Sequence, residues 1–244
     1  GLGDVYKRQT QNPPYQCNGA LMKLLGRKRK EPRTHIKLDV LEKRGYVVLN
    51  NYADPPIPSS EWLDLEYMDY KSGGDTNFAP IASAKGEMEC KAPWDHGMAD
   101  KNCTWTENAK RCPTLVKCVE DVAAPFGRVR VIKLLPSKSI QEVHTFMHQD
   151  RNNILNPPGE GWIVRVWLQL SHDPASFMIL RENKKWPLDE ARIPLPHGSQ
   201  FVVDSQRLFH SAFHPGPDPR YALIVSFESG PALDAWIARN RPQG

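Results

Sequence analysis

No stretch of the sequence is apolar for long enough to cross a bilayer. No window in its 244 residues approaches 18 consecutive apolar residues, and a transmembrane helix needs about 20. The first residues also lack the charged, apolar and small-residue order of a secretory signal. These absences argue against a membrane protein, and we expect a cytoplasmic location.

Cysteine is sparse, and no two cysteines are spaced as C-x-x-C. The chain has five, an odd number that does not suit a disulfide framework. Four of them, at positions 90, 103, 112 and 118, cluster around His96. They leave a zinc site open as an alternative, although spacings of 13, 9 and 6 residues match no standard zinc motif.

A basic stripe interleaved with aromatic residues, of the kind that single-strand nucleic-acid binders use, is missing too. The net charge is +4, but residues 1–34 hold eight Lys or Arg and two acidic residues. The rest of the chain therefore has a net charge of −2. Nucleic-acid binding is not expected outside the basic N-terminal arm.

Composition divides the chain into an arm and a domain. Residues 1–34 are basic and rich in Gln, Asn and Pro, which predicts a flexible arm, and residues 1–9 read as a non-native leader because they do not begin with Met. The chain is 40% hydrophobic and 25% charged, which is ordinary for a globular protein. Residues 35–244 are therefore expected to form a single domain.

Short strands dominate the expected secondary structure. Apolar patterns and turn residues predict strands at 46–49, 128–135, 140–150, 162–171, 177–181, 185–188, 200–204 and 220–227. Helices are expected at 20–25, 38–44, 61–70, 114–123 and 232–239. Residues 74–113 show little periodicity and are interpreted as a long, partly ordered insertion. This pattern indicates a mainly β fold with flanking helices, whose core at about 125–228 is a double-stranded β-helix, the cupin-like jelly roll.

A His and an Asp stand two residues apart at His148 and Asp150. On the strand expected at 140–150, both side chains point to one face and can reach one metal ion. His210, about sixty residues further on, is the best candidate for a third ligand. Two imidazoles and one carboxylate on one face of an octahedron form the facial triad of non-haem Fe(II) oxygenases. The sequence therefore predicts a catalytic metal site made by these three residues.

Arg220 begins another expected strand, ten residues after His210. Its guanidinium suits a dicarboxylate cosubstrate, because the planar fork makes paired hydrogen bonds with a carboxylate. Two other histidines compete for the metal. His144 has no carboxylate two residues after it, and His214 lies only six residues before Arg220, so the spacing favours His210.

These motifs resemble a known family. The segment Phe209–Phe227, with its His-Ser-Ala and its later Arg-Tyr-Ala-Leu, is similar to the C-terminal half of the 2-oxoglutarate- and Fe(II)-dependent oxygenases. Arg165–Leu170, the expected hairpin at Lys185-Trp186, and Gly198–Asp204 are most similar to the aspartyl/asparaginyl and proline hydroxylase group. The resemblance covers roughly residues 125–228 and only vaguely the N-terminal third.

The resemblance implies a role for two arginines and departs at one position. Arg220 would bind the distal carboxylate of 2-oxoglutarate, and Arg165 would bind a carboxylate of the cosubstrate or of the primary substrate. Trp167 stands where the group has a His that contacts the cosubstrate, so that contact is not carried over. Trp167 and Gln169 share the face of Arg165, where they would shape the pocket or pack in the core.

The resemblance implies an Fe(II)- and 2-oxoglutarate-dependent dioxygenase that uses O2, with ascorbate as reductant, and converts 2-oxoglutarate to succinate. Its substrate would be a small molecule or a peptide, namely an amino acid or an aspartyl, asparaginyl or prolyl residue. Two alternatives stay open. One is a cupin with another metal and without 2-oxoglutarate, and the other is an inactive binding module on the same fold.

Overall fold

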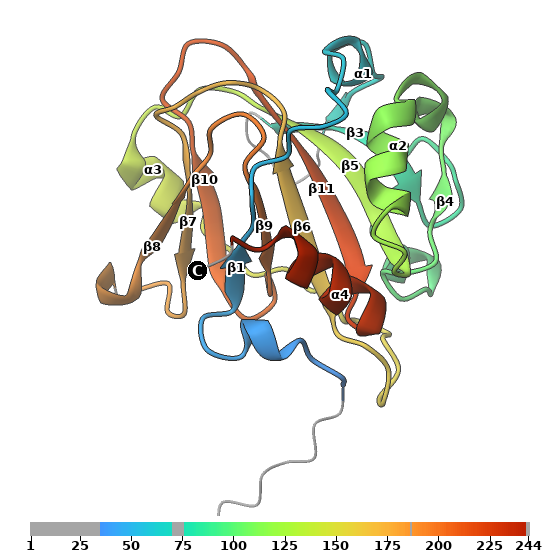
Figure 1. Ribbon diagram of the computed structural model, residues 1–244. Coiled ribbons are helices and arrows are strands. Elements are labelled where there is room, and N and C mark those ends of the chain that lie inside the picture. Colours follow the sequence, from blue (N-terminus) through green and yellow to red (C-terminus); the bar gives the residue numbers. More distant parts are fainter. Residues whose placement is uncertain (1–34, 70–75, 186, 243–244) are drawn as a thin grey trace, which may run out of the picture. The chain divides into compact units, whose positions relative to one another are not determined.

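Two antiparallel sheets form the core of the described part of the chain (Figure 1). The computed structural model describes residues 35–69, 76–185 and 187–242. The expected arm, its helix at 20–25 and the Trp of the expected hairpin lie outside these ranges.

The larger sheet has eight strands in the order β1-β9-β6-β11-β5-β3-β2, with β4 paired to β3, and the smaller has the order β10-β7-β8. The strands are β1 Tyr46–Val48, β2 Met68–Asp69, β3 Thr76–Ser83, β4 Thr104–Trp105, β5 Phe126–Leu134, β6 Ile163–Gln169, β7 Phe177–Arg181, β8 Ala191–Pro194, β9 Gln200–Val203, β10 Phe209–Phe213 and β11 Arg220–Glu228. The helices are α1 Ser60–Leu63, α2 Pro113–Glu120, α3 Ile140–Thr145 and α4 Pro231–Asn240, with 3-10 turns at Asp39–Leu41, Pro93–His96, Glu107–Arg111 and Pro187–Asp189.

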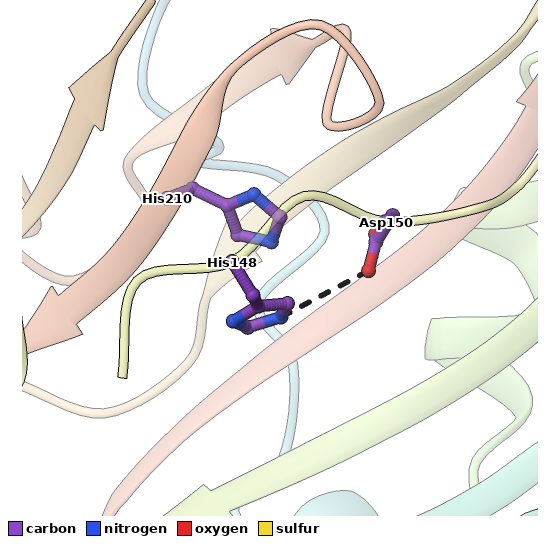
Figure 2. Close-up of side chains that lie close together, drawn as sticks. All are labelled: His148, Asp150 and His210. Atoms are coloured by element: carbon purple, nitrogen blue, oxygen red, sulfur yellow. Dashed lines mark ion pairs between the residues drawn. The ribbon is translucent and has the colours of Figure 1, made fainter. Parts of the chain in front are cut away.

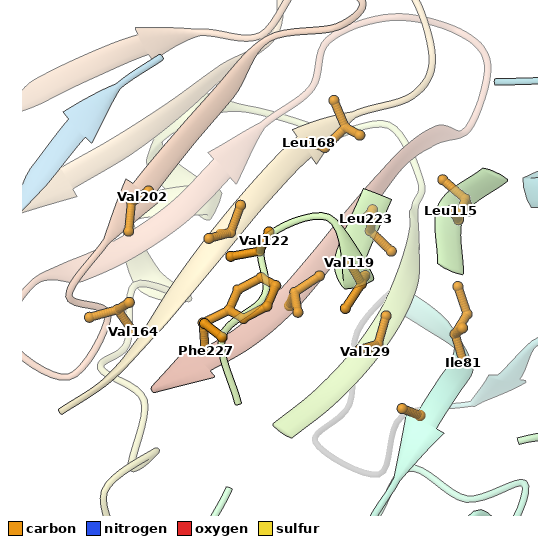
Figure 3. Close-up of a cluster of buried hydrophobic side chains, with 14 of the residues drawn as sticks. Ile81, Leu115, Val119, Val122, Val129, Val164, Leu168, Val202, Leu223 and Phe227 are labelled. Atoms are coloured by element: carbon orange, nitrogen blue, oxygen red, sulfur yellow. The ribbon is translucent and has the colours of Figure 1, made fainter. Parts of the chain in front are cut away.

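Helices α2 and α4 cover the outer face of the larger sheet (Figure 1). Apolar residues at helical spacing on α2, such as Leu115 and Val119, are buried in one cluster with residues of the sheet such as Leu223 (Figure 3). Strand β6 is buried along its whole length, because its other face is covered as well. Its sequence therefore alternates residue size and polarity between two buried faces.

The inner face of the larger sheet packs on the smaller sheet. A second core cluster joins Trp167 and Phe201 of the larger sheet to Met178 and Leu180 of the smaller one. Helix α3 covers the outside of the smaller sheet, where Val143 meets the neighbouring apolar residues of β7. Two facing antiparallel sheets with few helices confirm the expected jelly roll.

The strand expected at 140–150 is wrong. Residues Ile140–Thr145 form helix α3 instead, and His148 makes only an isolated bridge to His210. The helix begins because the hydroxyl of Ser139 accepts a hydrogen bond from the backbone N–H of Glu142 at 3.1 Å, an N-cap that the strand interpretation overlooked.

The interpretation of residues 74–113 as a partly ordered insertion is wrong for residues 76–83. Strand β3 lies within this segment and pairs with β5 inside the larger sheet. Pro80 hides the strand in the sequence, because proline donates no ladder hydrogen bond. The register shifts between Pro80 and Ala82, a β-bulge that accommodates the proline.

Three further expected elements differ from the structure. The helix expected at 61–70 ends after one turn at Leu63, and the chain then forms β2. The strand expected at 185–188 is absent from the described residues there, because the hairpin partner of β7 is β8, Ala191–Pro194. The helix expected at 38–44 is only a 3-10 turn at Asp39–Leu41. The remaining strand and helix predictions in the described ranges are confirmed within a few residues of their expected bounds.

Candidate metal centre

His148 and Asp150, on the loop that follows α3, come together with His210 of β10 (Figure 2). One ligand atom from each lies within 4.8 Å of the others, and no other group of this kind occurs among the residues that the structure describes. The two histidines are held by paired backbone hydrogen bonds, from the N–H of His148 to the carbonyl of His210 at 3.3 Å and back at 2.9 Å. This two-residue bridge therefore positions the two histidines, a role that was expected of a longer strand.

Both histidines turn the same nitrogen towards the centre. Nδ1 of His148 lies 3.0 Å from the carbonyl oxygen of Phe146, and Nδ1 of His210 lies 3.2 Å from that of Leu208. A carbonyl only accepts, so the hydrogen-bond network assigns the proton of each neutral ring to Nδ1. Each Nε2 then carries a free lone pair, which is the form of histidine that binds a metal.

The carboxylate of Asp150 is held on one side only. Its Oδ2 accepts hydrogen bonds from Nε of Arg165 at 3.2 Å and from the hydroxyl of Ser205 at 2.9 Å. Its Oδ1 faces Nε2 of His148 at 3.9 Å. Burial opposes ionisation, but the charge of Arg165 outweighs it and holds the pKa of Asp150 below its usual range. Oδ1 is therefore an ionised oxygen directed at the centre.

The three side chains differ in exposure. The His148 side chain is 62% exposed, whereas that of Asp150 is 24% exposed. His210 lies deeper on β10, and burial lowers its pKa, which favours the neutral ring. The centre therefore opens to solvent on the side of His148.

Arg165 donates to Asp150 of the candidate metal centre, and its other nitrogens also contact groups of the protein. Besides Asp150, its guanidinium donates to the hydroxyl of Ser226 and to Oδ1 of Asn152 at 2.8 Å, and it lies 3.4 Å from Asp100. Each of its three nitrogens thus has an acceptor. In the structure, the carboxylate that Arg165 contacts is the side chain of Asp150.

Asp100 anchors this arginine from behind. It is fully buried and accepts hydrogen bonds from Nε and Nη2 of Arg128 at 3.2 and 2.8 Å. Burial disfavours its charge, but Arg128 and Arg165 outweigh burial and lower the pKa of Asp100 to about 2. A buried chain of alternating charges therefore runs from Arg128 through Asp100 and Arg165 to Asp150.

Arg220 lies on the inner face of the larger sheet and is 1% exposed. Its Nη2 donates to Oε1 of Gln169, whereas Nε and Nη1 are buried and have no partner among the described residues. Burial lowers its pKa to about 9, so the guanidinium stays charged at neutral pH. Gln169 and Arg165 stand four residues apart on β6, roughly 13 Å at the usual rise, so the face between them connects Arg220 to the metal centre.

The competing ligands are engaged elsewhere. Nδ1 of His214 lies 2.6 Å from Asp173, and its Nε2 lies 2.6 Å from the carbonyl oxygen of Asp218. Nε2 of His144 lies 3.2 Å from Glu190. The four cysteines at 90, 103, 112 and 118 are free thiols and belong to no metal-capable group in the described ranges, so the structure gives the zinc alternative no support.

Sequence reasoning missed three residues that support the centre: Asp100, Asn152 and Ser205. Asn152 continues the alternation of His148 and Asp150 and could have been noticed for that reason. Asp100 lies in the segment that was interpreted as an insertion, and no local pattern links it to Arg165.

Comparison with known proteins identifies the fold. No family model matches the sequence, and no curated protein matches it significantly. A structure described as an oxidoreductase of the 2OG-Fe(II) oxygenase family, from Burkholderia pseudomallei, matches with a TM-score of 0.50 and 13% identity over 77% of this chain and 86% of that one. The chain therefore has the fold of that oxygenase, as the motifs in residues 125–228 predicted.

Two other solved structures match less closely. A prolyl hydroxylase from Trichoplax adhaerens, in complex with a peptide of hypoxia inducible factor, has a TM-score of 0.44 and 15% identity over 80% of this chain and 88% of that one. HygX from Streptomyces hygroscopicus, with nickel and 2-oxoglutarate bound, has a TM-score of 0.41 and 11% identity over 78% and 84%.

Proposed function

We propose that the protein is an Fe(II)- and 2-oxoglutarate-dependent dioxygenase that hydroxylates an amino acid, either free or as an aspartyl, asparaginyl or prolyl residue of a peptide. The convergence of His148, Asp150 and His210 within 4.8 Å, on the fold of an Fe(II) oxygenase, is the observation that carries this proposal. Two neutral imidazoles and one carboxylate are the donor set of the facial triad.

The donor atoms fit Fe(II). Hydrogen bonds from Nδ1 to backbone carbonyls free Nε2 of His148 and His210, and the contacts of Asp150 free its Oδ1. Three protein ligands leave further positions on a six-coordinate ion for small ligands. Iron and 2-oxoglutarate, with O2 as the oxidant, would supply oxidative decarboxylation to succinate and CO2, in which one oxygen atom of O2 enters succinate and the other hydroxylates a substrate C–H bond. The chain's task is to hold the ion and to orient both substrates.

The unpartnered guanidinium of Arg220 supports 2-oxoglutarate as the cosubstrate. Buried donors are nearly always paired, so two buried N–H groups without an acceptor indicate an external anion. Gln169 fixes the third nitrogen and thereby the orientation of the fork. A carboxylate accepts such a fork with two hydrogen bonds, and the strength of this pair grows in a buried site.

A cavity lined in part by Leu180, the residue that pairs with His210 across β7 and β10, is the candidate site for the primary substrate. Its volume is about 260 Å³, and its lining includes Leu180 and Leu208. Leu180 stands directly opposite His210 in the pairing of β10 with β7, and Leu208 precedes His210 by two residues. Lys43 and Arg44 stand at the same cavity. A side chain that entered here would approach the metal centre along the inner face of the smaller sheet.

Succinate formation tests the proposal. The purified protein would be incubated with Fe(II), 2-oxoglutarate, ascorbate and air, together with a panel of amino acids and short peptides. We expect turnover that Asp150→Ala abolishes, whereas the matched control Asp121→Ala, at an exposed carboxylate paired with Lys117, leaves it unchanged. Arg220→Ala should regain turnover only at high 2-oxoglutarate, because the substitution removes binding and leaves the metal ligands.

Metal content separates the alternatives. A protein that binds Fe(II) tightly but forms no succinate and shows no 2-oxoglutarate-dependent absorbance band without air would be a cupin of another chemistry. A protein that binds no metal at all would be a binding module. Either outcome contradicts the proposed dioxygenase.

A further inference from the structure

Trp167 occupies the middle of the inner face of β6, between Arg165 and Gln169. Its side chain is buried, at 6% exposure, and its ring stacks on Phe201 with centroids 5.7 Å apart and an interplanar angle of 19°. The other neighbour of the ring is Arg220, whose Cζ lies 5.4 Å from the ring centroid. Trp167 therefore stands on the path between the metal centre and the dicarboxylate-binding arginine.

The indole N–H of Trp167 is buried and has no acceptor among the described residues. An unpaired buried donor costs about 1–3 kcal/mol, and buried Trp N–H groups usually find a partner. Packing alone does not explain it, because a Phe at this position would stack on Phe201 without burying a donor. The N–H therefore indicates an acceptor that the protein itself does not provide.

Three N–H donors without acceptors thus gather on this face: the indole N–H of Trp167, and Nε–H and Nη1–H of Arg220. The ring contact brings the two side chains together. The amide nitrogen of Gln169 donates to the carbonyl and the hydroxyl of Ser171, so its oxygen is turned to Arg220. No side-chain carboxylate among the described residues forms an ion pair with Arg220, which leaves this donor set for an anion from outside.

We propose that the indole N–H of Trp167 donates a hydrogen bond to a carboxylate of the dicarboxylate that Arg220 binds, a role that rests on the proposed 2-oxoglutarate dependence. Trp167 is then a cosubstrate-binding residue and not a substitute that fills space where the resembling group has a His. An indole donates at every pH, whereas a histidine at the same place would change its charge near neutral pH. Binding of the cosubstrate at this point would therefore not depend on a proton.

Calorimetric titration of 2-oxoglutarate into the Mn(II)-loaded protein measures the contribution of the N–H. Hydrogen bonds to charged groups contribute more than those between neutral groups, so Trp167→Phe should raise the Kd for 2-oxoglutarate by roughly 10- to 100-fold. Trp105→Phe is the matched control, because Trp105 also packs against a phenylalanine, Phe126, in a tilted ring pair, but belongs to β4. Its Kd should equal that of the wild type.

A second variant separates a donor from a space filler. Trp167→His restores an N–H but fills less volume than Phe, so we expect it to bind 2-oxoglutarate more tightly than Trp167→Phe. A role in packing alone predicts the opposite order. The two substitutions therefore give different rankings for the two roles.

The wild-type protein gives an independent reading that needs no folded variant. The chain has seven Trp and hence seven indole N–H signals in a ¹⁵N NMR spectrum. With diamagnetic Zn(II) in the site, 2-oxoglutarate should shift one of them strongly downfield. If the wild type binds 2-oxoglutarate but no indole signal moves, or if Phe outranks His, the role of Trp167 is refuted while the proposed function stands. If the wild type binds no 2-oxoglutarate, the proposed function itself fails.

Discussion

Replacing Asp100 by Asn should destabilise the protein in a pH-dependent way. The side chain is fully buried and accepts hydrogen bonds from Arg128 and from Ser226, with Arg165 at 3.4 Å. Asn keeps the shape but removes the charge and turns two N–H groups towards a guanidinium. Breaking a buried ion pair in this way typically costs about 3–5 kcal/mol, which is the loss we expect at pH 7.

The pH dependence follows from the pKa of Asp100. Its pKa falls from the ordinary 3.8 to about 2 in the folded protein. A depressed carboxyl pKa contributes stability that is fully present above pH 4 and is lost as the pH falls through the folded value. The pH-dependent part of the stability that the Asp100 charge provides is therefore about 2 kcal/mol, and about 1 kcal/mol of it is already lost at pH 3.

Urea unfolding at pH 7, 5, 4 and 3 checks this value. The difference in unfolding free energy between the wild type and Asp100→Asn should shrink by about 1 kcal/mol from pH 7 to pH 3. Asp121→Asn, at an exposed carboxylate, serves as the control for a charge removed without burial. A difference that stays constant over this range would show that the charge of Asp100 is not stabilised by the arginines.

Three more outcomes follow from the same region. Arg165→Met should weaken Mn(II) binding by roughly 10- to 100-fold in calorimetry, because the Asp150 carboxylate loses the hydrogen bond that orients it. An unchanged Kd would show that Asp150 keeps its position without Arg165. Gly127→Ala should cost about 3 kcal/mol in urea unfolding, since its Cβ would lie 2.0 Å from the carbonyl oxygen of Asp100, whereas Gly230→Ala meets nothing within 4 Å and should cost far less. Burial raises the pKa of Cys103 to about 12, so at pH 8 iodoacetamide should leave Cys103 unlabelled in the native protein and label it in urea, by peptide mass spectrometry.

Local patterns were sufficient where neighbouring residues decide the structure. The alternation in Ile163–Gln169 and in Arg220–Glu228 predicted two central strands, because a sheet buries residues with period two. Pro80 concealed β3, since a proline in a strand is tolerated only where a bulge removes the need for its N–H. Ser139 caps α3, a role that was missed because residues 140–150 were interpreted as a strand.

The convergence of His148, Asp150 and His210 could be predicted, but the contacts that hold them in place could not. His148 and Asp150 lie close in sequence, and the family motif points to His210. Asp100 contacts Arg128 on β5, Ser226 on β11 and Arg165 on β6. These three strands are neighbours only in the assembled sheet, so no local pattern predicts the contacts. The role first expected for Arg165 therefore stays a prediction, and the contacts in the structure favour a role in holding Asp150.

The unequal exposure of the three proposed ligands has a consequence for the rate of metal binding. The side chains of Asp150 and His210 are mostly covered by the surrounding protein, whereas the ring of His148 is largely exposed to solvent. An arriving ion would first contact Asp150 and His210, and rotation of the His148 side chain would then add the third contact. Release would follow the reverse order, so chelators should strip the metal at a rate that is set by one imidazole and not by opening of the two sheets.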